Sequence, residues 1–155
     1  MPASHDATTP RQVFERGQRL LLQPELDADA IAGQFAPDAV FDLPFAPPGL
    51  PRRVAGREAI RAMYRAAGAR SRPSFEIDSV MVHETVDPEV IVTEFEVHAS
   101  RADTGEDYRF ANLQVITVRD GEIVSLRDYW NPLDRPELAA LATTVSGAAD
   151  PEQEP

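Results

Sequence analysis

The chain has 155 residues, of which 43% are hydrophobic and 26% charged, so it can build one hydrophobic core but is too short for two. Its 26 acidic residues outnumber its 15 basic ones and give a net charge of −11, which repels nucleic-acid backbones and anionic membrane surfaces. There is no cysteine, which excludes disulfides, thiolate metal sites and cysteine nucleophiles.

The two ends of the sequence differ in character from its middle. Residues 1–8 and 143–155 are small, polar and acidic, so we expect flexible tails around one domain at 9–142. The first ten residues lack the pattern of a signal peptide, and no apolar run approaches the ~20 residues that span a bilayer. These features predict a cytoplasmic protein with no nucleic-acid or membrane partner.

The first half of the chain predicts three helices and one strand. Thr9 before Pro10 is typical of a helix start, and Asp27 can cap a second short helix that reaches Phe35. Residues 39–45 favour a strand, and a proline-rich loop follows it. A helical apolar spacing over 57–67 then predicts a third helix, closed by Gly68.

The second half changes to the period-two pattern of strands. Strands are expected at residues 75–84, 90–100, 108–118 and 122–130. Because Asp120-Gly121 and other short turn sequences separate them, they should form an antiparallel meander. Asn131-Pro132 ends the sheet, and a short closing helix is expected after Asp134.

Helices followed by a long antiparallel meander indicate an α+β fold, in which the helices pack on one face of the sheet. We expect a cone, formed by a curved antiparallel sheet wrapped around the N-terminal helices. Its concave side would offer an apolar pocket for a small organic molecule.

The last predicted strand carries the main catalytic candidate. Its alternation places Leu126, Asp128 and Trp130 on one face, so Asp128 would lie among apolar neighbours. Desolvation there raises the pKa of a carboxyl and lets it act as a general acid. The alternative is a structural aspartate that is neutralised by an arginine or hydrogen-bonded to backbone.

Polar candidates on other elements could orient a ligand. Asn112 and Gln114 share a strand face with aromatic residues, although cross-strand hydrogen bonds or a dimer interface would also explain them. Tyr64 on the third helix could present its hydroxyl to the pocket, or simply be part of the core. Phe41 and Leu43 belong to the apolar face of the strand expected at residues 39–45, before the third helix.

The histidines give weaker signals. His98 shares a strand face with Glu94 and Glu96, but residues in a row ~7 Å apart cannot converge on one ion. We therefore predict no metal site and interpret this row as a solvated or dimer-facing stripe. His83 shares its predicted face with Phe75, so it could line the pocket or be a core histidine.

The order of elements, with the segments at 35–41 and 56–60, resembles the nuclear transport factor 2-like superfamily, in its SnoaL-like and ketosteroid isomerase-like branches. The resemblance covers residues 13–141 and implies the same cone, also called cystatin-like. Segments 84–88, 108–109 and 127–132 are similar to phenazine biosynthesis A/B proteins. In those proteins an acidic residue shortly before Asn-Pro donates a proton, and the residue at that position here is Asp128. Limonene epoxide hydrolases also look similar at this strand.

Departures from these families restrict the reaction that the resemblance implies. The steroid isomerase base would fall at Leu43, and the first helix carries no tyrosine. The phenazine A/B histidine would fall near Met63. The arginine and aspartate pair of the epoxide hydrolases is missing around His98.

We expect an enzyme of secondary metabolism that needs no cofactor and uses Asp128 for acid–base isomerisation, cyclisation or condensation. The alternative is a non-catalytic ligand-binding or assembly protein. The resemblance also suggests a homodimer through the outer sheet face. The expected ligand-contacting residues are Asn112, Gln114, Tyr64, Trp130, Phe41, Leu43, His83, His98 and Met63.

Overall fold

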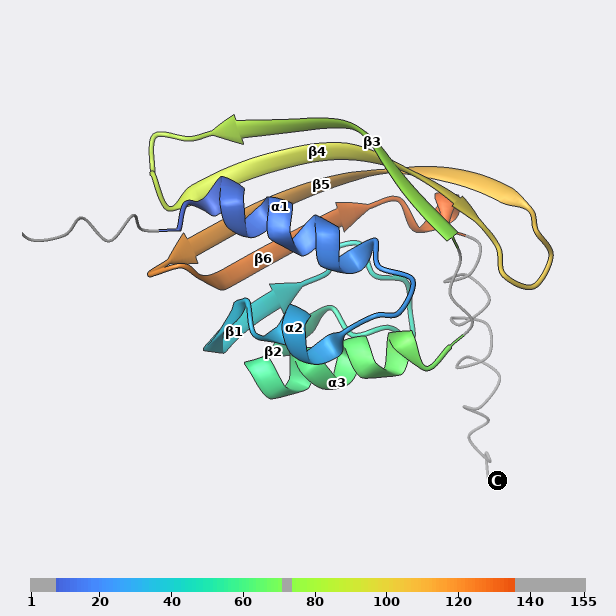
Figure 1. Cartoon of the computed structure of the whole chain (residues 1–155), viewed down its shortest axis with the longest axis horizontal. Helices are drawn as coiled ribbons and strands as arrows, with labels where there is room; N and C mark the ends of the chain where they lie inside the picture. The colour runs from blue at the N-terminus through green and yellow to red at the C-terminus, as the bar shows by residue number, and fades with distance from the viewer. Residues whose placement is uncertain (1–7, 71–73, 136–155) are drawn as a thin grey trace, which may run out of the picture.

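The computed structural model describes residues 8–70 and 74–135, in which six strands form one curved sheet in the order β2-β1-β6-β5-β4-β3. Three helices lie along one side of this sheet (Figure 1). This is the expected α+β arrangement, and the sheet is curved without closing on itself. The helices are α1 (Pro10–Leu21), α2 (Ala28–Ala32) and α3 (Arg57–Gly68).

The four-stranded meander is confirmed, and each of its strands lies within one residue of its expected bounds. The elements of the sheet are β1 (Phe35–Asp42), β2 (Arg53–Ala55), β3 (Ser74–Glu84), β4 (Val90–Ser100), β5 (Asp107–Arg119) and β6 (Glu122–Trp130). Strands β3 to β6 are each antiparallel to the next. A single 3-10 turn, η1 (Pro132–Asp134), follows β6.

The helix starts are also confirmed, because the capping side chains make the bonds that their types predict. The Thr9 hydroxyl accepts from the Gln12 backbone N–H at 3.2 Å, and the Gln12 side chain accepts from the Thr9 N–H at 2.9 Å. This reciprocal pair is a capping box. The Asp27 carboxylate accepts from the Ala30 N–H at 2.9 Å at the start of α2.

The first strand differs from its prediction in both bounds and pairing. It begins at Phe35, which was expected on the preceding helix, and it ends at Asp42. Strand β1 runs parallel to β6, with an irregular register between Phe35 and Val40 that accommodates Pro37. Its other edge pairs with β2, which the sequence did not predict.

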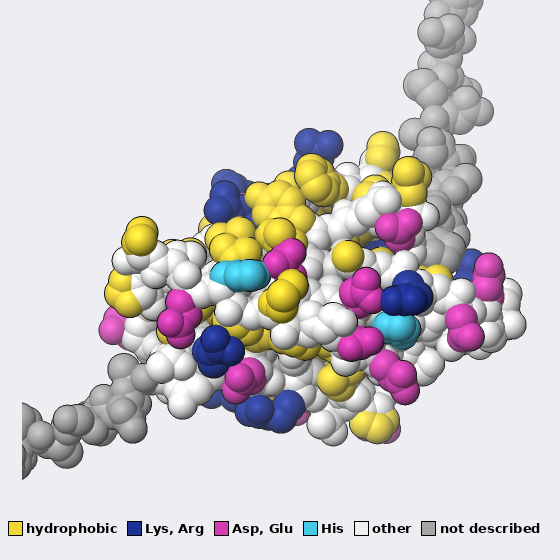
Figure 2. Space-filling view, turned by 90° about the horizontal axis from the view of Figure 1, so that it is seen from above, with side chains coloured by type: hydrophobic (Ala, Val, Ile, Leu, Met, Phe, Trp, Pro, Cys, Tyr) yellow, Lys and Arg dark blue, Asp and Glu magenta, His cyan; other side chains and the backbone are white. Residues whose placement is uncertain are grey.

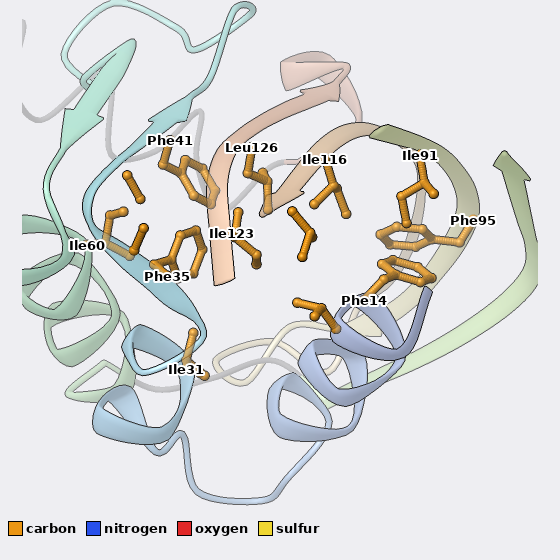
Figure 3. Close-up of a cluster of buried hydrophobic side chains, with 14 of the residues drawn as sticks. Phe14, Ile31, Phe35, Phe41, Ile60, Ile91, Phe95, Ile116, Ile123 and Leu126 are labelled. Carbon is orange, nitrogen blue, oxygen red and sulfur yellow. The ribbon is translucent and has the colours of Figure 1, made fainter. Parts of the chain in front are cut away.

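The core lies between the inner face of the sheet and the helices (Figure 3). Strand β4 shows why this face is apolar, because every second residue from Ile91 to Ala99 is buried. Helix α1 covers it with Phe14, whose ring centroid lies 6.0 Å from that of Phe95. Ile60 of α3 is completely buried on the other side, near Phe35.

The end of the described chain differs from the expected closing helix. Asn131, not Asp134, is the capping residue, and its side-chain oxygen accepts from the Leu133 N–H at 3.1 Å. The rest of the predicted helix and both predicted tails fall outside the described residues, apart from Thr8. Among the described residues, none of the helices has the length and hydropathy needed to cross a membrane.

Candidate functional site

The candidate site lies on the inner face of β5 and β6, near the middle of the sheet. Asp128 stands opposite Gln114 in the ladder, and Trp130 stands opposite Asn112. The Asn112 amide N–H donates to an Asp128 carboxylate oxygen. The structure therefore brings together four of the residues that the sequence singled out, on the face that was predicted for them.

The environment of Asp128 controls its charge. Burial raises the pKa of its carboxyl to about 6, because a charged group loses solvation away from water. The hydrogen bond from Gln114, the positive charge of Arg135 and the hydrogen bond from Asn112 each oppose this rise. The residue as a whole is half-buried, and its carboxyl can gain and lose a proton near neutral pH.

Helix α3 faces this carboxyl with Tyr64. The Tyr64 ring packs edge-on against Phe41, with 6.5 Å between the ring centroids. Burial, and after it the negative charge of Asp128, raises the pKa of the Tyr64 phenol, so the hydroxyl stays protonated as a hydrogen-bond donor. Phe41 is buried in the core, and Leu43 and Met63 are half-buried against it.

Arg135 also belongs to this site, although the sequence gave no reason to choose it. The central guanidinium carbon lies 4.5 Å from the centroid of the Phe110 ring and 4.9 Å from that of Trp130. Both rings belong to the inner face and are buried. Period-two alternation ends at the Asn-Pro pair, and the closing helix that was expected after Asp134 gave no reason to place Arg135 on the inner face.

Both described histidines lie on the outer face of the sheet, away from Asp128. The expectation that His83 shares a face with Phe75 is wrong, because a bulge between Asp78 and Met81 reverses the alternation of β3. His83 Nε2 lies 2.7 Å from a Glu94 carboxylate oxygen. Neither histidine contacts the inner site, so neither can serve there as a ligand residue.

His98 lies in the charged row that was expected to be solvated or to face a dimer partner. Its Nε2 lies 3.6 Å from Asp78 and 3.9 Å from Glu96. The described residues contain no group of three or more His, Cys, Asp or Glu side chains that could hold a metal ion.

A groove of about 840 Å³ crosses the outer face of the sheet. Exposed hydrophobic side chains line it, among them Phe45, Met81 and Leu113. Figure 2 shows such side chains gathered on this face, with charged side chains and histidines around them. Phe45 packs edge-on against Tyr129 at 5.5 Å between ring centroids, so the groove has an aromatic wall.

Comparison with known proteins places this site in a family context. The family model described as a SnoaL-like domain matches residues 24–126. A PhzA/B-like protein of Pseudomonas aeruginosa is 34% identical over 126 residues, which cover 79% of this chain and 88% of that protein. The Bacillus subtilis protein YesE is 36% identical over 96 residues, covering 62% of this chain and 65% of YesE, just under two thirds of its length.

Solved structures share the fold. A candidate isomerase from Bacillus subtilis is 29% identical with a TM-score of 0.74, covering 84% of this chain and 91% of that one. A phenazine biosynthesis-related protein from Pseudomonas aeruginosa is 20% identical with a TM-score of 0.64, covering 94% and 91%. A candidate polyketide cyclase from Xanthomonas campestris is 19% identical with a TM-score of 0.65, covering 84% and 95%.

Proposed function

Because the chain belongs to the SnoaL-like family, we propose that it is an enzyme that moves a proton on a small organic substrate with Asp128. The observation that carries this proposal is a carboxyl on the inner face whose pKa is raised to about 6 by burial. A general acid or base works best when its pKa lies near the working pH. The reaction class is isomerisation, cyclisation or condensation.

The proton transfer follows from the two charge states of Asp128. With a pKa of about 6, roughly nine tenths of the carboxyl is ionised at pH 7. The carboxylate can take a proton from a carbon next to a carbonyl group and return it to another atom of the same substrate. Proton transfer of this kind contributes ~10²- to 10⁴-fold to the rate.

The neighbours of Asp128 have separate tasks in this proposal. The amides of Asn112 and Gln114 hydrogen-bond the carboxyl and hold it in one orientation. The Tyr64 hydroxyl, kept protonated by its raised pKa, can donate to a substrate oxygen on which negative charge develops. Asn112 and Gln114 thus orient the carboxyl, Tyr64 stabilises the substrate, and Asp128 exchanges the proton.

The names of similar structures support this reaction class. One is a candidate isomerase and another a candidate polyketide cyclase, and both kinds of reaction can proceed by removing or adding a proton at a carbon or oxygen atom. The second of these is under 25% identical to this chain, so that likeness shows the fold alone.

The proposal is tested by the exchange of carbon-bound protons in deuterated water. Wild-type protein should speed deuterium uptake beside the carbonyl of simple cyclic ketones, and Asp128→Asn should reduce this rate to that of the buffer. Asp38→Asn, which removes an exposed carboxylate on β1, is the matched control and should remain active. Uptake is followed by proton NMR.

Full activity in the Asp128→Asn variant would refute the role of this carboxyl. If wild-type protein binds the ketones without exchanging their protons, the molecule is a ligand-binding protein of the same fold, and Asp128 is a structural residue.

For the assembly, we propose a homodimer through the outer face of the sheet. The groove with Phe45, Met81 and Leu113 supports this arrangement, because exposed apolar side chains that cluster on one face are typical of protein interfaces. A second copy could place its own outer face against them. This leaves both inner sites open to substrate.

A further inference from the structure

The chain turns back on itself directly after β6. The Asn131 side chain accepts from the Leu133 N–H and donates to the Asp134 carboxylate, each at 3.1 Å. The Arg135 N–H then closes the turn on the Pro132 carbonyl at 3.3 Å. As a result, the residue that follows the turn extends its side chain over the inner face.

At that place the Arg135 guanidinium rests on two aromatic rings. Its central carbon lies 4.5 Å from the Phe110 centroid and 4.9 Å from the Trp130 centroid. A guanidinium is flat, and its five N–H donors lie around its edge. Ring contacts use its face, so two donors can bind a carboxylate side by side while the others keep further partners.

Arg135 is also close enough to Asp128 for its positive charge to lower the pKa of that carboxyl. Arg135 lies over Trp130, and Trp130 follows Asp128 by two residues on the same face of β6. The two charged groups therefore occupy neighbouring positions of one surface. Positions two residues apart on a strand are separated by ~7 Å. A compact ring compound can span this distance.

Charge decides which kind of compound this is. The chain carries a net charge of −11, and Asp128 adds a carboxylate at the reacting position, so an organic anion is repelled unless a cation holds it. We propose that Arg135 binds the carboxylate of the substrate, so that the substrate is a small organic acid whose reacting carbon lies beside Asp128. Only the second part, the placement of the reacting carbon beside Asp128, rests on the proposed function.

The single tryptophan of the chain is a built-in reporter of this site, because Trp130 lies under Arg135. The probes are cyclohexanecarboxylate and the uncharged cyclohexanecarboxamide, which have the same ring and do not absorb at the excitation wavelength. Titration of Trp130 fluorescence should show the carboxylate binding at least about ten-fold more tightly than the amide, as expected for a charge-assisted bidentate hydrogen bond.

Three variants test whether Arg135 causes this preference. Arg135→Met keeps the length and packing of the side chain and should bind both probes equally, whereas Arg135→Lys should keep part of the difference. Arg127→Met is the matched control, because it removes the same charge from an exposed position of β6. It should keep the full preference.

Equal binding of the two probes to wild-type protein, or no saturable signal with either, would overturn the proposal. A preference that survives in Arg135→Met would overturn it as well. Asp128→Asn separates this proposal from the proposed function: it should keep the preference for the carboxylate even though the proton exchange is lost. If Asp128→Asn keeps full exchange activity but Arg135→Met loses the preference, only the proposed function fails.

Discussion

At the residue scale, the carboxyl of Asp128 couples the site to the stability of the fold. Its pKa is about 6 in the folded chain, against an ordinary value of 3.8 for an aspartate carboxyl. Between these values the folded chain holds a proton that the unfolded chain has lost. The free energy of unfolding therefore falls as the pH rises through this range, and the deficit remains at higher pH.

Asp128→Asn should remove this pH dependence. Between pH 4 and pH 7 the free energy of unfolding of the wild-type chain should fall by on the order of 2 kcal/mol more than that of the variant. Urea unfolding of both proteins at each pH measures the difference, and other titrating groups cancel because they are common to both. Parallel pH profiles would show that Asp128 has an ordinary pKa.

The same residue shows what the sequence can indicate about a site. Alternation along the last strand was enough to place Asp128 and Trp130 on the inner face, and Asn112 and Gln114 followed from the strand before it. The hydrogen bond from Asn112 to Asp128 could not be predicted, because it depends on the register between two strands, and one residue of slip would reverse every side chain.

At the element scale, turn sequences predicted where the strands end, whereas a bulge inside a strand could not be predicted and reversed the face assigned to the residues after it. The Asp120-Gly121 turn was predicted from its sequence, and both residues have positive φ, 51° and 77°, as this type of hairpin requires. The bulge of β3 has no such signal. Ser79 adopts a φ of 54° there, although serine is not a residue that marks this conformation, so His83 was placed on the wrong face.

Gly121→Ala tests the turn between β5 and β6. A Cβ at a φ of +77° is strained, so the substitution should lower the free energy of unfolding by about 1 kcal/mol. Gly121→Asn is the matched comparison and should cost less, since asparagine tolerates this region. Chemical denaturation gives both values. An unchanged stability in Gly121→Ala would mean that the hairpin relaxes to another turn.

At the scale of the whole molecule, the outer groove predicts the assembly. Leu113→Arg places a charge among apolar side chains near the middle of the proposed interface and should convert the dimer to a monomer. Glu94 stands opposite Leu113 in the ladder, so the new arginine can form an ion pair and the fold should be kept. Sedimentation velocity measures the association state.

The control for this prediction is Val86→Arg, at a fully exposed position that does not line the groove. It should leave the dimer intact. A wild-type chain that sediments as a monomer at every concentration would contradict the proposed homodimer.

Whole-molecule features were the hardest to predict from the sequence. The meander and the helix caps depend on residues near one another, so local patterns indicated them. Pairing of β1 with β6 depends on residues far apart in the chain, and so does the contact of Arg135 with Phe110. Local propensity even favoured a helix at Phe35, and the distant partner strand overrode it.

The parallel pairing of β1 with β6 has a consequence for synthesis on the ribosome. Strand β1 emerges early and can pair with β2 soon afterwards, but β6, its neighbour on the other edge, emerges only after β3, β4 and β5. During this interval Phe35 and Phe41 lack their partner residues on β6, Ile123 and Leu126, and closing so long a loop is slow. The nascent chain is therefore most prone to aggregation before β6 is made, and chaperone binding to β1 should be greatest in that interval.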